Sequence, residues 1–189
     1  MSKQTESLQN TFLVAMPNMP DPRFKRSVTY ICEHNESGAM GLVINQPTNL
    51  TVGELLDQID IENNKMDRNC SLAVMSGGPV HTDRGFVLHS SKPGYSSSSA
   101  ISSEIMITTS KDVLHELTGH EAPERFIITL GYAGWDPGQL ERELIENTWL
   151  TVPADPEIIF NTPAHLRWQK AIESLGIDIN KLTQYSGQA

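Results

Sequence analysis

The stretch GGPVHTDRGFVLH, which begins at Gly77, contains the residue types capable of the most kinds of chemistry. The side chains of His81, Asp83 and His89 are of types that bind metal ions or form acid–base pairs, and backbone N–H groups at Gly77 and Gly78 could hold an anion. The stretch also fits a tight turn between two strands. We favour the turn, because His81 and Asp83 would lie on an exposed connection and His89 at the far end of the next strand.

A second candidate is a cysteine–histidine pair formed by Cys32 and His34. Residues two apart in a strand point to the same face, so the imidazole could activate the thiol as a thiolate. We interpret Cys32 as a packed residue instead, because it continues the face made by Val28 and Tyr30. Cys32 and Cys70 form no C-x-x-C motif, which predicts two reduced, partly buried thiols.

Two further stretches place polar groups at turns. In GYAGWDPG, backbone N–H groups at a helix start could bind an anion, but Asp136 at the expected N-cap would repel it, so a structural turn is favoured. Asn45 ends a strand before Gln46 and Pro47, where its amide either binds a small ligand or satisfies backbone groups of the turn. The residues that could bind a ligand are therefore His34, Asn45, Gly77, Gly78, His89, Trp135 and Asp136.

No complete signature of metal, nucleotide or nucleophile chemistry occurs in the sequence. It contains no H-E-x-x-H, G-x-x-x-x-G-K-[ST], G-x-G-x-x-G or G-x-S-x-G motif. We therefore expect no metal site, no catalytic residue and no cofactor. A protein that is not an enzyme is favoured, with an unrecognised enzyme as the alternative.

The elements that would position these residues mix β-hairpins with helices. A hairpin is expected over residues 27–45, with a connection of four or five residues, and Thr51 with Glu54 forms a capping box at a helix start. Asp136 is expected to cap another helix. The serine-rich residues 90–103 predict a flexible loop. Strands are predicted in TFLVAM, CSLAVMSGGP, RGFVLHS, SEIMITTS and ERFIITLGYAGW, and short extended segments in WLTVP and EIIFN. Without a regular βαβ rhythm, the chain is expected to be α+β.

Charge and hydrophobicity exclude several classes of protein. The net charge of −9 opposes direct nucleic-acid binding, since such binding depends largely on neutralising phosphates. No segment approaches the roughly 18 apolar residues of a membrane span. The N-terminal segment has neither the apolar run nor the cleavage site of a signal peptide, so we expect a cytoplasmic protein.

Taken together, the motifs resemble the YqgE/AlgH family of bacterial proteins. The resemblance covers about residues 11–176 and rests on AMPNMPDPRFKRSVTYICEHNESGAMGLVINQP, GGPV, GFVLH, GYAGWDPGQLERELIENTWL and PADPEIIF, which stand in the family's order. It implies an α+β fold in which a mixed, mostly antiparallel bent sheet, partly bifurcated, forms a pseudo-barrel flanked by helices. We expect a disordered N-terminus over residues 1–10 and a single domain over residues 11–189.

The resemblance implies an association with transcriptional regulation but brings no established reaction and no catalytic residues. Our first hypothesis is therefore an AlgH-type regulator that acts indirectly, through a protein partner or a small ligand. The alternative is a small-molecule-binding protein, or an unrecognised enzyme, with a pocket beside the sheet. The sequence does not specify the oligomeric state.

Overall fold

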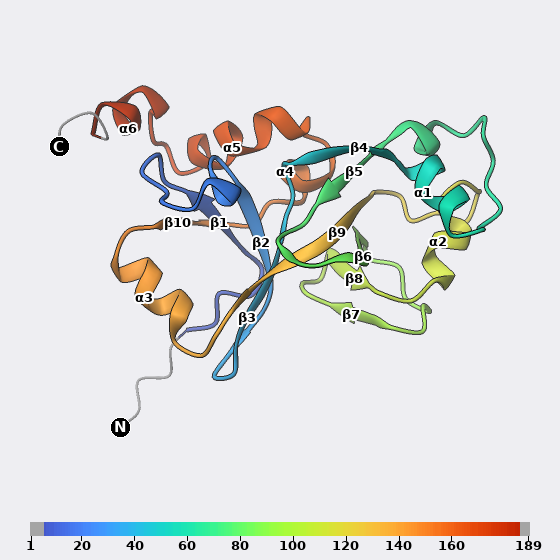
Figure 1. Ribbon diagram of the computed structural model, residues 1–189, viewed down its shortest axis with the longest axis horizontal. Coiled ribbons are helices and arrows are strands. Elements are labelled where there is room, and N and C mark those ends of the chain that lie inside the picture. The colour runs from blue at the N-terminus through green and yellow to red at the C-terminus, as the bar shows by residue number, and fades with distance from the viewer. Residues whose placement is uncertain (1–5, 186–189) are drawn as a thin grey trace.

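A computed structural model describes residues 6–185, which form a curled, mostly antiparallel sheet flanked by helices (Figure 1). The strands follow the order β10-β1-β2-β3-β9-β6-β8-β7, with β4 and β5 joined to the side of this path. Their bounds are β1 Thr11–Ala15, β2 Val28–Asn35, β3 Gly38–Val43, β4 Pro47–Thr51, β5 Ala73–Ser76, β6 Val80–Ser90, β7 Ser98–Ala100, β8 Ile105–Thr108, β9 Phe126–Trp135 and β10 Trp149–Pro153.

The α-helices of the described chain lie in three places around the sheet (Figure 1). Helix α5 lies against β1 and β2 and contacts α4 and α6, and α4 also contacts β9; α3 lies near β10 and β3, and α1 and α2 lie at the far end, with α1 beside β4 and β5. Their bounds are α1 Val52–Gln58, α2 Asp112–Glu116, α3 Gln139–Ile145, α4 Pro156–Phe160, α5 Ala164–Glu173 and α6 Ile179–Tyr185. This arrangement confirms the α+β fold and the bent sheet expected from the sequence.

The sheet branches along strand β9, which pairs with β3, β5 and β6. Its first half pairs with β6 on one edge and in parallel with β5 on the other, while its second half pairs with β3. The partner on one edge therefore changes from β5 to β3 along a single strand. This change explains why one long apolar segment, ERFIITLGYAGW, holds the two ends of the molecule together (Figure 1).

The glycine pair after β5 lies at this branch. The Gly77 N–H donates to the Leu130 carbonyl at 2.7 Å, and the Gly77 carbonyl accepts from the Val43 N–H at 2.8 Å. Gly78 has a φ of 151°, and a Cβ placed there would lie 2.2 Å from the Tyr132 carbonyl carbon. Since only glycine has no Cβ, the pair lets two backbones approach where the sheet divides.

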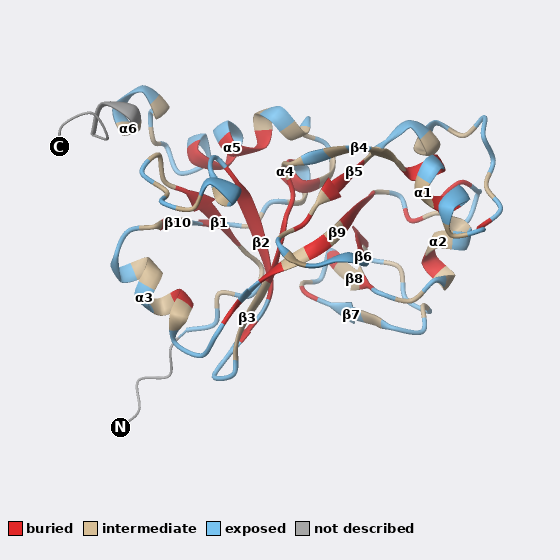
Figure 2. Cartoon of the chain, viewed as in Figure 1, coloured by how far each residue is buried: buried red, intermediate tan, exposed pale blue. Residues whose placement is uncertain are grey.

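Three apolar clusters stabilise the sheet, and buried residues follow most of its strands (Figure 2). One packs α4 against the strands through Ile158 and Ile159, and α5 through Trp168, Ala171 and Ile172. A second lies under α3 and includes Leu140. The third packs α1 and α2 against β5, β6 and β9, with Leu56 almost fully buried. The elements that flank the sheet are thus held mainly by burial of apolar surface.

The predicted hairpin is confirmed as β2–β3, but its connection is shorter than expected. Asn35 pairs with Gly38, so two residues connect the strands. The short extended segment expected in EIIFN is wrong, because most of it forms helix α4. Asp155 accepts a hydrogen bond from the Glu157 N–H, and Pro156 occupies the first turn. Part of the expected serine-rich loop is also ordered, because β7 pairs with β8.

Two boundaries near the candidate residues also differ from expectation. Helix α3 begins at Gln139 with Gly138 as its N-cap, so Asp136 does not cap it. Strand β6 begins at Val80, earlier than predicted, and its pairing with β9 is interrupted between Val80 and Gly85. The residues between them bulge out of the ladder, which keeps Asp83 exposed, as expected for that segment.

The N-terminal segment is described from Glu6 onward, so residues 1–5 of the expected disordered terminus lie outside the described residues. The Leu8 N–H donates to Nδ1 of His34 at 2.9 Å, and the Ser7 hydroxyl donates to the His34 carbonyl at 3.1 Å. These contacts tie the chain before β1 to the end of β2.

Candidate functional site

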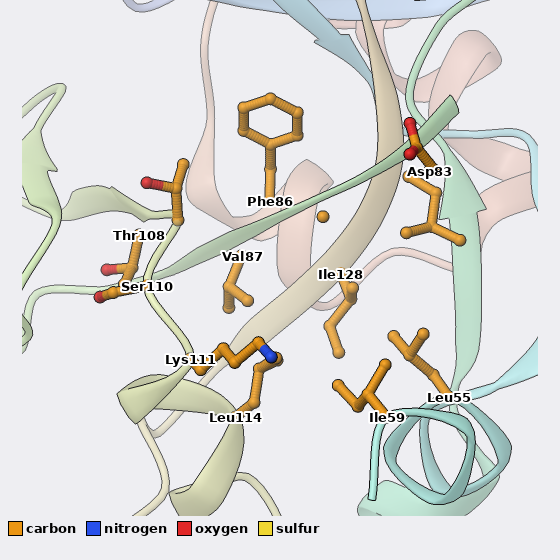
Figure 3. Close-up of a pocket in the computed structure, with 13 residues that line it drawn as sticks. Leu55, Ile59, Asp83, Phe86, Val87, Thr108, Ser110, Lys111, Leu114 and Ile128 are labelled. Atoms are coloured by element: carbon orange, nitrogen blue, oxygen red, sulfur yellow. The ribbon is translucent and has the colours of Figure 1, made fainter. Parts of the chain in front are cut away.

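A small apolar cavity lies between helices α1 and α2 and the strands β6, β8 and β9 (Figure 3). Its volume is about 190 Å³. The walls are mostly aliphatic and aromatic, formed by Leu55, Ile59, Gly85, Phe86, Val87, Leu114, Ile128 and Leu130. A concave, mostly apolar hollow with a few polar groups at its edge is the usual form of a small-molecule site.

The spacing of apolar residues in the sequence determines which side chains form the helix wall and the sheet wall of the cavity. Thr51 and Glu54 form the predicted capping box of α1, which is confirmed, and Leu55 and Ile59 follow four residues apart on one helix face. On the sheet side, Val87 pairs with Ile128, so both side chains stand on the same face of neighbouring strands. Helix and sheet therefore face each other with apolar side chains that do not completely fill the space between them.

The polar part of the cavity is contributed by the β6 bulge and by the segment from β8 into α2. Asp83 and Lys111 are exposed, and neither side chain forms a hydrogen bond or ion pair in the described part of the chain. The Ser110 hydroxyl is occupied, because it donates to Asp112 at 2.5 Å and accepts from the Ser97 N–H at 3.0 Å. The unused charged groups of the cavity are thus one carboxylate and one ammonium.

A chain of hydrogen bonds runs behind the cavity wall through the predicted ligand residue His89, which is fully buried. Its Nδ1 lies 2.8 Å from the Ser90 carbonyl, which only accepts, so Nδ1 carries the proton. Its Nε2 then accepts from the Thr108 hydroxyl at 2.7 Å, and Thr108 accepts from Ser98 at 2.9 Å. The chain ties β6, β8 and β7 together.

Burial lowers the pKa of His89 by disfavouring its charged form, and nearby Lys92 adds to the effect against the hydrogen bond to Ser90. His89 is therefore neutral at pH 7. Although His89 and Thr108 have the contact of a base and a nucleophile, Thr108 is 0% exposed and both its hydrogen bonds are made within the sheet. The geometry of the pair therefore supports a structural role, holding strands together, rather than a catalytic role.

His34 lies at another place, near helix α3. Because the Leu8 N–H donates to Nδ1, the proton of His34 is on Nε2, which donates to Glu141 at 2.7 Å. Burial is the largest single influence on Glu141 and favours its neutral form, but the hydrogen bond from His34, a backbone hydrogen bond and the electrostatic effect of His34 together hold the pKa of Glu141 below its usual value. His34 and Glu141 thus connect β2 to α3.

The considered Cys32–His34 pair does not form, because β2 contains a bulge. The register with β3 shifts between Ile31 and Glu33, so His34 faces the same side as Ile31 rather than Cys32. Burial raises the pKa of the Cys32 thiol, which stays protonated. Cys32 and Cys70 are both free thiols, as predicted.

Trp135 contributes to a separate network under α3. Its indole N–H donates to Glu143 at 2.6 Å, and the Trp149 indole N–H donates to the same carboxylate oxygen at 3.2 Å. Asp136 is exposed, and its backbone N–H donates to Gln139 at 3.0 Å. One carboxylate thus joins α3 to both β9 and β10.

Asn45 satisfies backbone groups at the end of the hairpin. Its Oδ1 accepts from the Val28 N–H at 2.8 Å, and its Nδ2 donates to the Arg26 carbonyl at 2.9 Å. This is the turn role considered for it, and both polar atoms of the amide have a partner within the protein.

The predicted ligand residues do not gather at one site. His34 and Trp135 both contact α3, Gly77 and Gly78 lie at the sheet branch, and His89 lies behind the cavity through Thr108. No side-chain hydrogen bond or ion pair joins two of the seven within residues 6–185. The cavity residues were missed, although the capping box and the spacing of Leu55 and Ile59 carried a signal for them.

The described residues contain neither a membrane-spanning helix nor a cluster of metal ligands. No helix there is long and apolar enough to cross a membrane. No group of three or more histidine, cysteine, aspartate or glutamate side chains there is arranged to hold a metal ion.

These features define an α+β protein with a branched, mostly antiparallel half-barrel sheet and a small apolar cavity at one end. The chain belongs to the AlgH-like family, whose sequence profile matches residues 12–180. This match confirms the resemblance drawn from the motifs.

Individual relatives agree with this assignment. The chain is 65% identical over 184 residues to a UPF0301 protein of Pseudoalteromonas translucida, covering 97% of this chain and 100% of the relative. A UPF0301 protein of Vibrio cholerae is 54% identical, covering 97% of this chain and all of the relative.

Two solved structures share the fold. The solution structure of the AlgH protein from Pseudomonas aeruginosa has a TM-score of 0.80 and 46% identity, covering 97% of both chains. The crystal structure of protein DIP2367 from Corynebacterium diphtheriae has a TM-score of 0.73 at 20% identity, covering 98% of this chain and 94% of that one. The second comparison shows likeness of fold alone.

Proposed function

We propose that this chain is a non-enzymatic regulatory protein that acts indirectly, by binding a small molecule in the cavity between α1, α2 and the sheet. The observation that carries the proposal is an apolar hollow whose rim holds an unpaired carboxylate, Asp83, and an unpaired ammonium, Lys111. We place the protein in the cytoplasm and treat residues 11–189 as one domain.

An enzymatic function is less well supported by the same geometry. The histidine–hydroxyl contact beside the cavity, between His89 and Thr108, is enclosed within the sheet, and the Ser110 hydroxyl is held by Asp112 and the Ser97 N–H. Apolar walls with two charges at the rim suit recognition of a small molecule, since binding needs only shape and a few polar contacts.

The cavity also suggests how binding would produce a signal. Leu55 belongs to α1 and Ile59 caps its C-terminus, Leu114 belongs to α2, and Val87 and Ile128 belong to the sheet. A bound molecule would contact all three and fix the helices relative to the strands. A protein partner that contacts α1 or α2 would then bind the loaded and empty forms with different affinity.

A thermal-shift screen against a library of small metabolites tests the proposal. A ligand present at a hundred times its Kd adds roughly 2.7 kcal/mol to the stability of the folded state. For a domain of this size, that raises Tm by about 5–10 °C. We expect at least one compound with an apolar body to give such a rise.

A matched pair of variants locates the binding. Leu114→Trp places a larger side chain in the cavity and should abolish the shift, whereas Leu72→Trp adds the same ring at an exposed position outside it. The Leu72 variant should keep the full shift. If every hit shifts the Leu114 variant as much as the unchanged protein, the cavity is not the binding site.

The indirect mode of regulation has its own test. With a net charge of −9, the protein should not bind promoter DNA tightly in fluorescence anisotropy at physiological salt. Tight binding that weakens steeply as salt is added would show direct contact with DNA and would contradict the indirect mode.

A further inference from the structure

The cavity holds two opposite charges that do not neutralise each other. Asp83 comes from the bulge of β6 and Lys111 from the residue before α2, and Figure 3 shows them on opposite sides of the hollow. Neither side chain has a hydrogen-bond or ion-pair partner among the described residues. The neighbouring carboxylate, Asp112, is already engaged by the N–H and hydroxyl of Ser96 and by the Ser110 hydroxyl.

We propose that the ligand of this cavity is a small zwitterion with an apolar body, whose anionic group meets Lys111 and whose ammonium group meets Asp83. The inference rests on the proposed function, since it names the chemical class that the same site would accept. A neutral apolar molecule would fill the hollow but leave both charges unused. A molecule with a single charge would pair with one of them and face a like charge at the other side.

The size of the hollow limits the apolar body. A cavity of about 150 Å³ lined by similar aliphatic and aromatic side chains accommodates benzene. At about 190 Å³, this cavity suits a body of roughly six carbon atoms. The charged ends would project toward the exposed side chains of Asp83 and Lys111, where water screens them.

A matched set of four six-carbon compounds tests the charge requirement: 6-aminohexanoate, hexanoate, hexylamine and hexan-1-ol. Isothermal titration calorimetry or an NMR titration gives a Kd for each. Exposed ion pairs contribute modestly, so each matched charge should tighten binding by a factor of about 1.5 to 5. We expect 6-aminohexanoate to bind more tightly than the other three.

Charge reversal gives a sharper test. Lys111→Glu alone and Asp83→Lys alone should each weaken binding of 6-aminohexanoate, because one end then meets a like charge. The double variant, Asp83→Lys with Lys111→Glu, should restore binding with the ligand reversed. The control reversals Glu36→Lys and Lys25→Glu lie outside the cavity lining and should change nothing. Neutral variants, Lys111→Gln and Asp83→Asn, replace any reversal that fails to fold.

The outcomes separate the two proposals. If hexan-1-ol binds in the cavity as tightly as 6-aminohexanoate, the zwitterion inference is wrong while the ligand site stands. If the double reversal binds no better than the single reversals, the inference is also wrong. If none of the four compounds binds and the metabolite screen gives no hit, the proposed function itself fails.

Discussion

The branch of the sheet at Gly77 and Gly78 makes a quantitative prediction about stability. A Cβ at Gly78 would lie 2.2 Å from the Tyr132 backbone, and an alanine at this position would have to adopt a φ of 151°. Gly78→Ala therefore combines two penalties, a clash with backbone that cannot move aside and a backbone conformation that L-residues resist. Two other glycines separate these penalties.

Gly77 has the clash without the unusual φ, since its Cβ would lie 2.4 Å from the Gly131 carbonyl oxygen. Gly94 has the unusual φ without the clash, with a φ of 114° and nothing within 4 Å. A left-handed backbone costs about 1–2 kcal/mol for an L-residue, and overpacking costs about 1–3 kcal/mol. We expect losses of about 1–3 kcal/mol for Gly77→Ala and about 1–2 kcal/mol for Gly94→Ala.

Gly78→Ala should lose about 2–5 kcal/mol, the sum of the two penalties. All three variants lower the entropy of the unfolded chain alike, so that contribution cancels in the comparison. The measurement is urea unfolding followed by tryptophan fluorescence, with the free energy of unfolding taken from each curve. If Gly78→Ala were no less stable than Gly94→Ala, the close backbone crossing at the branch would be wrong.

Three further perturbations test the contacts around the sheet. Folding lowers the pKa of His89 from its ordinary value of 6.5, so as the pH drops below 6.5 the unfolded chain binds a proton at this residue more readily than the folded chain does. The free energy of unfolding should therefore fall as pH drops below 6.5, by at most about 1.4 kcal/mol per pH unit. His89→Asn should flatten this slope in urea unfolding from pH 7.5 to 5, and an unchanged slope would show that His89 is not the group responsible. Arg167→Ala removes the donor to the Ile44 carbonyl and should lower stability in the same assay by about 1–3 kcal/mol for each carbonyl left unpaired. Glu143→Ala removes the acceptor of the Trp135 indole, so it should lose more stability than Glu143→Gln, which keeps an oxygen there, and equal losses would contradict the contact.

The parts of the fold that the sequence predicted were those with strong local signals. The capping box at Thr51, the β2–β3 hairpin and the long apolar strand β9 all rest on residues close together in the chain. The family resemblance supplied the bent sheet. Helix α4 was missed, because the short apolar run of EIIFN suits an extended segment equally well, and the signal for a helix lies outside that run, in the N-cap Asp155.

The candidate site was harder to predict, because its geometry depends on two bulges. A bulge in β2 turns His34 toward α3 and away from Cys32, and a bulge in β6 brings Asp83 to the cavity rim. A bulge adds residues to one strand without a distinct sequence signal, so alternation alone gives the wrong face beyond it. Lys111 is an ordinary exposed lysine in sequence terms, and only the fold places it across from Asp83.

Direct observation of ligand binding in the cavity tests the central claim most sharply. With methyl groups of isoleucine, leucine and valine labelled, NMR titration with the best compound from the screen reports on Leu55, Ile59, Leu114 and Ile128 separately from the rest of the core. We predict saturable shifts of these four residues and unchanged methyl resonances of Ile172, which lies in α5 and belongs to a different apolar cluster. Saturable shifts confined to methyls outside the cavity would contradict the claim.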